Sequence, residues 1–340
     1  MAEATLRSRS SAVDEFTASN TRTIVLVKIA EFTDKEWAGN FFKKNWPRWY
    51  GKEFPSSADI IPELEHQNIM VSGQERFNIG FTFSEPSLAK IIAHIDFNRH
   101  NIKAGPLKKI NEQNRKLMPR PLDYFPKHLM LVREFFPGES LHLIIKNCNL
   151  TRRHLEMTAG ILRQLHSIKE YSSFSKRNPL LKFLFANLKR SKRLNLALYP
   201  ILNGIIKTAF GALDKLPKGP VALCHGDLAP SNVIIAKNET RLIDWDLAHQ
   251  NDPTYDLAYF SAHLAETMTI KEISEQKVYD ARNLFLEAYS SDFSKKRFLA
   301  WEALMLAVIV DHLLQSYCYD HLKERMDFMM TMARKNLALL

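Results

Sequence analysis

Hydrophobic and polar positions follow two different patterns in the two halves of the chain. The first half contains short runs rich in β-branched residues, separated by turn residues such as Gly73 and Pro86. This pattern is typical of strands joined by short turns. It predicts strands at 22–31, 68–71, 79–83, 88–92 and 129–136. The middle three of these form a meander with Lys90 at the centre of its last strand.

Helical spacing of apolar residues dominates the second half. It predicts helices at 151–169, 177–193, 195–215 and over most of 253–340. Two earlier helices are predicted as well. A capping-box pattern at Thr33 to Glu36 begins the first, which Pro47 ends, and the second is a basic helix at 105–117. Short strands at 221–224, 232–235 and 241–243 interrupt the helical half.

The change in pattern near 137–140 predicts two lobes joined by a short connection. We expect an α+β, bilobal fold with a small antiparallel β-rich N-lobe and a larger, mostly helical C-lobe. Clefts between lobes are common sites for small molecules. The expected organisation is a disordered segment at 1–20, an N-terminal extension at 21–66, an N-lobe at 67–137 and a C-lobe at 138–340.

The clearest chemical pattern is His225-Gly226-Asp227, followed by Asn232 and then by Asp244 after the next strand. Asp227 comes directly after an apolar strand, where it could accept a proton from a hydroxyl group. Asn232 and Asp244 offer the hard oxygen ligands that suit Mg²⁺. Aspartate and asparagine also serve as turn residues. The three together, between apolar strands, favour a phosphoryl-transfer centre.

Other polar residues near this motif have less specific roles. We expect His225 to orient the loop by hydrogen bonding rather than to carry protons, and Asp256 to be structural. Asp246 could be a second neighbour of the metal or a turn carboxylate, and the sequence leaves both open.

The first half offers groups that could bind a nucleotide. Lys90 is a cation on a strand, where it could reach phosphates, although an edge-strand lysine in contact with solvent is the alternative. Lys103, Lys108 and Lys109 follow it closely. Glu112 could hold Lys90 in place, with Glu75 as a less favoured partner.

Two backbone segments complete the expected nucleotide site. Gly73 lies in a turn, where a backbone amide could approach a phosphate. Glu134 to Phe136 lies at the connection between the lobes, where backbone groups could pair with the edge of an adenine.

These motifs resemble the aminoglycoside phosphotransferase and choline kinase family. The resemblance rests on His225-Gly226-Asp227 with Asn232, on Ile243-Asp244-Trp245-Asp246, and on Asp252-Pro253 with Asp256-Leu257-Ala258. It covers about 68–265 and is strongest in 223–258. It implies a protein-kinase-like fold, with ATP and Mg²⁺ as cofactors. It also implies that Asp227 belongs to the catalytic loop, that Asp244 binds metal and that Asp256 is structural. The phosphate loop departs from the family, because Gly73 is its single glycine.

Composition restricts the partners and the compartment. The chain has 47 Lys and Arg against 37 Asp and Glu, a net charge of +10, which favours anionic partners such as nucleotides. We expect no nucleic acid as a partner. The basic, apolar segment 182–193 could contact an anionic membrane, but an amphipathic helix that packs on the core is favoured.

Three widely spaced cysteines indicate a reducing compartment. The segment 1–20 lacks the apolar run of a secretory signal, so we expect a cytoplasmic protein. The apolar run 298–310 contains Glu302 and predicts a buried helix rather than a membrane span.

The sequence therefore predicts an ATP- and Mg²⁺-dependent kinase. It transfers the γ-phosphate to a hydroxyl of a small molecule, such as a sugar, an amino alcohol or a glycolipid precursor. A protein Ser/Thr kinase is one alternative, although no long activation segment separates Asp244 from Asp256. A nucleotide-binding scaffold without activity is the other, which the sparse phosphate loop motivates.

Overall fold

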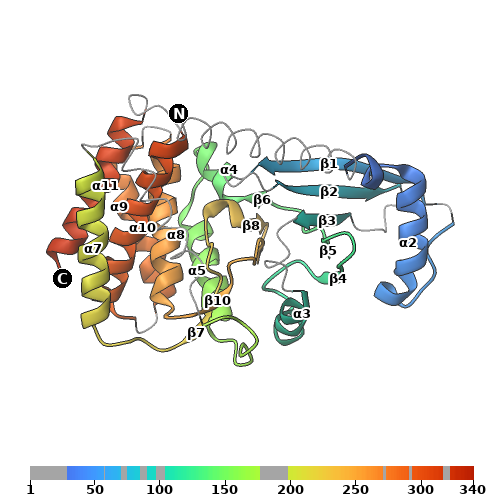
Figure 1. Ribbon diagram of the computed structural model, residues 1–340, viewed down its shortest axis with the longest axis horizontal. Coiled ribbons are helices and arrows are strands. Elements are labelled where there is room, and N and C mark those ends of the chain that lie inside the picture. The colour runs from blue at the N-terminus through green and yellow to red at the C-terminus, as the bar shows by residue number, and fades with distance from the viewer. Residues whose placement is uncertain are drawn as a thin grey trace, which may run out of the picture. The chain divides into compact units, whose positions relative to one another are not determined.

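The computed structural model describes residues 29–56, 58–69, 75–84, 90–96, 104–176, 198–270, 273–290, 293–316 and 322–340. The chain divides into two compact units (Figure 1). The first unit comprises Met1–Ala104 and Arg120–Phe135, and the second comprises Gly105–Pro119 and Phe136–Leu340. Gly73 and the basic segment 182–193 lie outside the described residues.

The first unit is built on a five-stranded sheet whose neighbouring strands are all antiparallel. The strand order is β1-β2-β3-β5-β4. The strands are β1 (Ile60–Ile69), β2 (Glu75–Phe83), β3 (Ile91–Asp96), β4 (Pro121–Phe125) and β5 (Met130–Glu134). The predicted antiparallel sheet is therefore confirmed.

Helix α2 (Lys35–Tyr50) packs its apolar residues against this sheet. Phe42 and Trp46 are almost fully buried and contact the rings of Phe81 and Phe83, with centroid distances between 5.0 and 5.4 Å. Aromatic pairs at such distances add to the free energy of apolar burial. The core of the first unit is therefore mainly aromatic.

Several local predictions for this unit are wrong. Residues 29–31 are helical rather than the end of the strand predicted at 22–31, whose first seven residues lie outside the described part of the chain. The next residue, Phe32, is fully buried, and its ring contacts Trp37, with centroids 4.8 Å apart. Asp34, not Thr33, caps α2 by accepting from the backbone N–H of Trp37. Pro47 lies inside α2, and the helix ends only at Gly51, which adopts a positive φ of 66°.

The strand boundaries also differ from those predicted. β1 begins at Ile60, well before the predicted start at residue 68. β3 begins at Ile91, three residues after the predicted start at residue 88. β4 was not predicted, because Pro119 and Pro121 read as turn residues. Pro121 starts β4 at the edge of the sheet, one of the places where proline is tolerated.

The second unit is mostly helical, as predicted. In it α10 packs against α7, α8 and α11, and Figure 1 shows these helices side by side. Its helices are α3 (Ala104–Gln113), α4 (Leu141–Lys146), α5 (Arg152–His166), α7 (Tyr199–Lys215), α8 (Thr254–Thr269), α9 (Glu275–Tyr289), α10 (Lys295–Ser316) and α11 (Lys323–Ala338).

Two small sheets carry the loops of the predicted phosphoryl-transfer motif. β7 (Ala222–Cys224) pairs with β10 (His249–Asn251), and both flank the motif in sequence. β8 (Val233–Ala236) pairs with β9 (Glu239–Leu242) as the predicted hairpin. The short strand β6 (Glu139–Ser140) also pairs with β8.

Helix α10 confirms the predicted buried helix at 298–310, and its buried Glu302 has partners. Arg282 donates to both carboxylate oxygens of Glu302, and the Asn336 amide donates at 2.7 Å. A fully buried carboxylate is tolerated when it is paired and hydrogen-bonded in this way. None of the described helices has the length and apolar character needed to cross a membrane.

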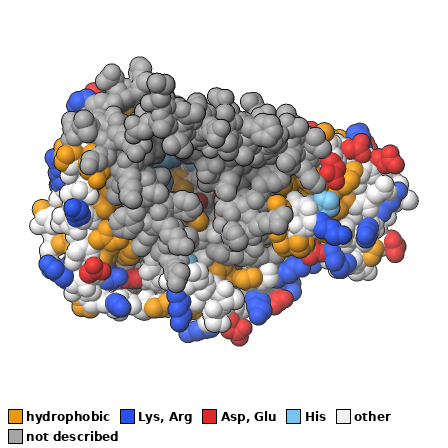
Figure 2. Space-filling view, in the orientation of Figure 1, with side chains coloured by type: hydrophobic (Ala, Val, Ile, Leu, Met, Phe, Trp, Pro, Cys, Tyr) orange, Lys and Arg blue, Asp and Glu red, His pale blue; other side chains and the backbone are white. Residues whose placement is uncertain are grey.

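Charged side chains of both signs are interspersed over the described part of the face drawn in Figure 2. Of the three cysteines, Cys148 is free and exposed, and Cys224 is free and buried.

Candidate active site

The predicted catalytic loop runs from the end of β7 to the start of β8. Gly226 has a positive φ of 84°, and a Cβ at this position would collide with the carbonyl of Leu247. Only glycine fits such a backbone without strain. The chain then turns through a short 3-10 helix, Pro230–Asn232, and enters β8. The glycine of the motif is therefore required by the close approach of the next loop.

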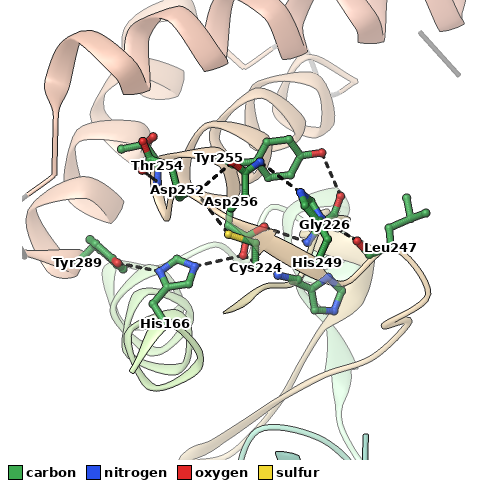
Figure 3. Close-up of polar contacts among 12 residues, drawn as sticks. His166, Cys224, Gly226, Leu247, His249, Asp252, Thr254, Tyr255, Asp256 and Tyr289 are labelled. Carbon is green, nitrogen blue, oxygen red and sulfur yellow. Dashed lines mark hydrogen bonds and ion pairs between the residues drawn. The ribbon is translucent and has the colours of Figure 1, made fainter. Parts of the chain in front are cut away.

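Asp256, on the first turn of α8, holds the backbone of this loop (Figure 3). Its carboxylate accepts from the backbone N–H of His225 at 2.7 Å and from that of Gly226 at 3.0 Å. The His166 ring contacts the same carboxylate at 3.2 Å, and its other nitrogen contacts the hydroxyl of Tyr289 at 2.7 Å. Complete burial alone would raise the pKa of Asp256, but the hydrogen bond and charge of His166, with the donors of the loop, lower it overall.

His166, Cys224 and Asp256 offer metal-ligand atoms within 4.8 Å of one another. The Asp256 carboxylate already accepts two backbone hydrogen bonds and contacts His166, and both ring nitrogens of His166 have partners. The burial and bonding of this group indicate a structural cluster rather than a metal site. It supports the structural role expected for Asp256.

Asp227 lies in the loop with one carboxylate oxygen bound. The hydroxyl of Tyr259, on α8, donates to Oδ1 of Asp227 at 2.6 Å. Burial, and then the negative charge of Asp244, raise the pKa of Asp227, while the hydrogen bond from Tyr259 opposes this shift. Desolvation and a neighbouring carboxylate both make a carboxylate more basic. A raised pKa is what a general base for a hydroxyl requires.

Asn232 is oriented by the loop itself. The side-chain NH₂ group of Asn232 donates to the backbone carbonyl of Asp227 at 2.8 Å. The backbone carbonyl of Asn232 accepts from the backbone N–H of Ile243 at 3.0 Å. The amide nitrogen is thereby committed to the protein, and the side-chain oxygen is the atom left to bind a ligand. The same contacts connect the catalytic loop to the segment that carries Asp244.

Asp244 directly follows this connection and has an unusual backbone. Its φ is 61°, in the left-handed region, and its side chain is exposed. The segment is held on both sides, because His225 contacts the carbonyl of Ile243 at 3.0 Å and the indole of Trp245 donates to Leu242 at 3.0 Å. A strained residue that its surroundings hold in place is often functional.

The donor set fits a hard divalent cation. The amide oxygen of Asn232 and the carboxylate of Asp244 are oxygen ligands. The negative charge of Asp244 also raises the pKa of Asp227. Mg²⁺ prefers such ligands and usually binds to one or two carboxylates together with phosphate oxygens of a substrate.

Lys90, in the first unit, forms an ion pair with Glu65 of β1. Its ammonium also lies 5.0 Å from the centre of the Phe135 ring. A Cβ on Gly80 of the facing strand would collide with the Glu65 side chain, so that glycine leaves room for it. Sequence reasoning missed Glu65, because it lies in the segment 21–66 that showed no motif.

Glu112, the predicted partner of Lys90, lies on α3 with an exposed side chain. Its role, like that of Gly73, stays a prediction. In the predicted adenine-binding segment, the backbone N–H of Glu134 donates to the backbone carbonyl of Arg120, and that of Phe135 donates to the backbone carbonyl of Lys90. Phe136 contacts the guanidinium of Arg241 with its ring, 4.8 Å from the centroid.

Comparisons with known proteins agree with this geometry. A sequence model described as "Phosphotransferase enzyme family" matches residues 110–288, more than half of the chain. The protein LicA homolog of Metamycoplasma hominis is 27% identical over 234 residues, which are 68% of this chain and 85% of that protein.

Solved structures show the same fold at low sequence identity. The choline kinase of Cryptosporidium parvum is 17% identical, with a TM-score of 0.58 over 90% of this chain and 95% of that chain. A choline/ethanolamine kinase family protein of Mesorhizobium loti is 16% identical, with a TM-score of 0.57 over 89% and 95%. The protein-kinase-like fold expected from the resemblance is thereby confirmed. On the match of the family model, this chain belongs to the phosphotransferase enzyme family.

Proposed function

We propose that this enzyme transfers the γ-phosphoryl group of ATP to a hydroxyl of a small molecule in a Mg²⁺-dependent reaction. The observation that carries the proposal is the joint placement of Asp227, Asn232 and Asp244. A hydrogen bond within the loop joins Asn232 to Asp227, and the negative charge of Asp244 raises the pKa of Asp227. Such a set meets the needs of phosphoryl transfer, which are positioning and charge neutralisation.

In the proposed reaction, the acceptor oxygen forms a bond to the γ-phosphorus as the bond from that phosphorus to the leaving oxygen of ADP breaks. The acceptor proton goes to the free oxygen of Asp227. Bound to Asn232 and Asp244, Mg²⁺ would neutralise charge on the phosphate oxygens. Lys90, paired with Glu65, is the cation that we propose the first unit offers to the nucleotide.

An amino alcohol is the acceptor class that we favour. The Metamycoplasma hominis relative is named a LicA homolog, and LicA of Streptococcus pneumoniae is a choline kinase. A kinase of peptide hydroxyls is disfavoured, because Asp244 and α8 are separated by only a short segment that contains β10.

The test measures transfer of the γ-phosphate from labelled ATP to choline, ethanolamine and a mixed Ser/Thr peptide, with Mg²⁺ or with EDTA. We expect a phosphorylated amino alcohol, formed only with the metal. Label in the peptide alone would establish the protein-kinase alternative. Binding of ATP without transfer to any acceptor or to water would establish the scaffold alternative.

A further inference from the structure

A tyrosine outside the sequence motif contacts the catalytic carboxylate directly. The hydroxyl of Tyr259 donates to Oδ1 of Asp227 at 2.6 Å, and the Tyr259 side chain is only 7% exposed. A hydroxyl that donates to a carboxylate makes one of the stronger hydrogen bonds in proteins. The neighbouring Tyr255, by contrast, donates to the backbone carbonyl of Gly226 at 3.3 Å. The two tyrosines of α8 therefore hold different parts of the same loop.

The bond from Tyr259 distinguishes the two oxygens of Asp227. Among the described residues, Oδ1 has this one hydrogen-bond donor and Oδ2 has none. Rotation of the carboxylate about its terminal bond is broad and roughly two-fold when nothing holds it. With Oδ1 bound, Oδ2 is the oxygen left to accept a hydrogen bond from another group.

Tyr259 is itself held in place by residues on the same face of α8. The His263 ring lies against it, with centroids 4.5 Å apart, and His263 contacts Glu266 at 3.0 Å. Glu266 in turn lies 3.9 Å from Arg325 on α11. The spacing of residues 259, 263 and 266 places these side chains on one helix face. The ring of Tyr259 therefore has little freedom to turn away from Asp227.

Helix α8 thus meets the catalytic loop at two points one turn apart. Asp256 binds the backbone of His225 and Gly226, while Tyr259 binds the side chain of Asp227. The first contact sets the path of the loop, and the second sets the orientation of the carboxylate. The two roles are separable, because one substitution can remove the second contact and leave the first.

We propose that Tyr259 is a positioning residue, which fixes Oδ1 of Asp227 so that Oδ2 points to the hydroxyl that is phosphorylated. This inference rests on the proposed function, because it takes Asp227 as the general base. Correct placement of a catalytic group contributes to the rate and not to the binding of nucleotide. Tyr259 should therefore affect kcat and leave the KM for ATP unchanged.

The test is Tyr259→Phe, which removes the hydroxyl and keeps the ring. ADP formation is measured from Mg²⁺-ATP with choline and, as a second reaction, with water as the acceptor. We expect kcat to fall about 10- to 100-fold, the loss that corresponds to one hydrogen bond to a charged group. The KM for ATP and the midpoint of thermal unfolding should stay close to those of the unmodified protein.

Tyr279→Phe is the matched control. The Tyr279 hydroxyl is buried and has no hydrogen-bond partner among the described residues, and its ring contacts Phe328 and Lys335 of α11. Its removal should leave kcat unchanged. A wild-type kcat in Tyr259→Phe would overturn the inference. A fall in kcat accompanied by a higher KM for ATP and a lower midpoint of thermal unfolding would also overturn the inference, because those changes together indicate a structural role.

Asp227→Asn separates failure of the inference from failure of the proposed function. If Tyr259 acts through Asp227, Tyr259→Phe should cause no further loss of the residual turnover in the Asp227→Asn background. An equal loss in both backgrounds would overturn the inference alone. Wild-type turnover in Asp227→Asn, or no ADP formation by the unmodified protein, would overturn the proposed function itself.

Discussion

In the first unit, the helix and the sheet pack through aromatic and aliphatic side chains. In the second unit, buried hydrogen bonds hold the loop that contains Asp227. Phe42 and Trp46 fill the space between α2 and the sheet. Asp256 holds the predicted catalytic loop through two backbone N–H groups. Apolar packing stabilises the sheet, where Glu65 of β1 pairs with Lys90 just before β3, while hydrogen bonds orient single atoms of Asp227. Polar contacts therefore position the predicted catalytic loop, and apolar contacts stabilise the sheet of the first unit.

The largest effect is expected where the buried polar network is broken. Asp256→Ala leaves two buried N–H groups without an acceptor, so we expect a loss of about 3 to 5 kcal/mol in the free energy of unfolding, with loss of turnover. Urea unfolding and ADP formation measure the two effects. The exposed Asp214 on α7 provides the control, because Asp214→Ala should change stability by less than about 0.5 kcal/mol. Equal stability of the two variants would refute the role given to Asp256.

A cavity in the first unit should lower stability without altering the chemistry. Ile95 of β3 is fully buried in the aromatic and aliphatic core, so Ile95→Ala should cost about 2 to 5 kcal/mol. Below its unfolding temperature the variant should keep a normal kcat. Exposed Ile61 on β1 provides the control, where truncation to alanine should have little effect. A kcat that falls as far as in Asp256→Ala would contradict the separation of scaffold and chemistry.

The pair in the first unit should affect nucleotide binding more than stability. Glu65→Gln removes the partner of Lys90, and both side chains are partly exposed. We expect stability to change by less than about 1 kcal/mol and the KM for ATP to rise roughly 3- to 10-fold. Glu112→Gln, measured in parallel, decides between the two candidate partners. A higher KM in Glu112→Gln alone would restore the partner predicted from the sequence.

The smallest effect is a pH dependence of stability that belongs to Asp256. Its pKa in the folded protein is below the unfolded value of about 3.9, because the bonds from His166 and the loop outweigh burial. The unfolded state therefore binds more protons, and stability falls as pH drops through this range. The contribution is complete above the unfolded pKa and is lost as pH falls through the folded pKa. Urea unfolding between about pH 3 and 6 should show a shallower acid slope in Asp256→Asn. An unchanged slope would assign the acid sensitivity to other groups.

Local spacing along the chain was enough to predict a catalytic loop, whereas contacts between segments distant in the sequence could not be predicted from it. The residues from His225 to Asp244 form one short turn and one hairpin, so closeness in the sequence predicts closeness of their side chains. The match to the phosphotransferase enzyme family confirms the family that these motifs resemble, while the roles of the single residues stay predictions. Glu65, in contrast, meets Lys90 only through the register of the sheet and the space beside Gly80.

Other elements were misread because packing outweighed local preference. Pro47 stays within α2, where the neighbouring Trp46 and Trp49 are buried in the core. Tyr259 reads in the sequence as one more apolar residue of a buried helix, and only its contact with Asp227 reveals another role. The roles of Gly73 and Glu112 stay predictions.

The proposed role of Asp227 as the general base is tested most directly by comparing Asp227→Asn with the unmodified protein in both ATP binding and turnover. Asparagine keeps the size of the side chain and the hydrogen bond from Tyr259, but it cannot take a proton from the acceptor. We expect kcat to fall about 100- to 10,000-fold, the usual contribution of a general base, while the affinity for Mg²⁺-ATP is retained. A kcat equal to that of the unmodified protein would contradict the proposed role of Asp227.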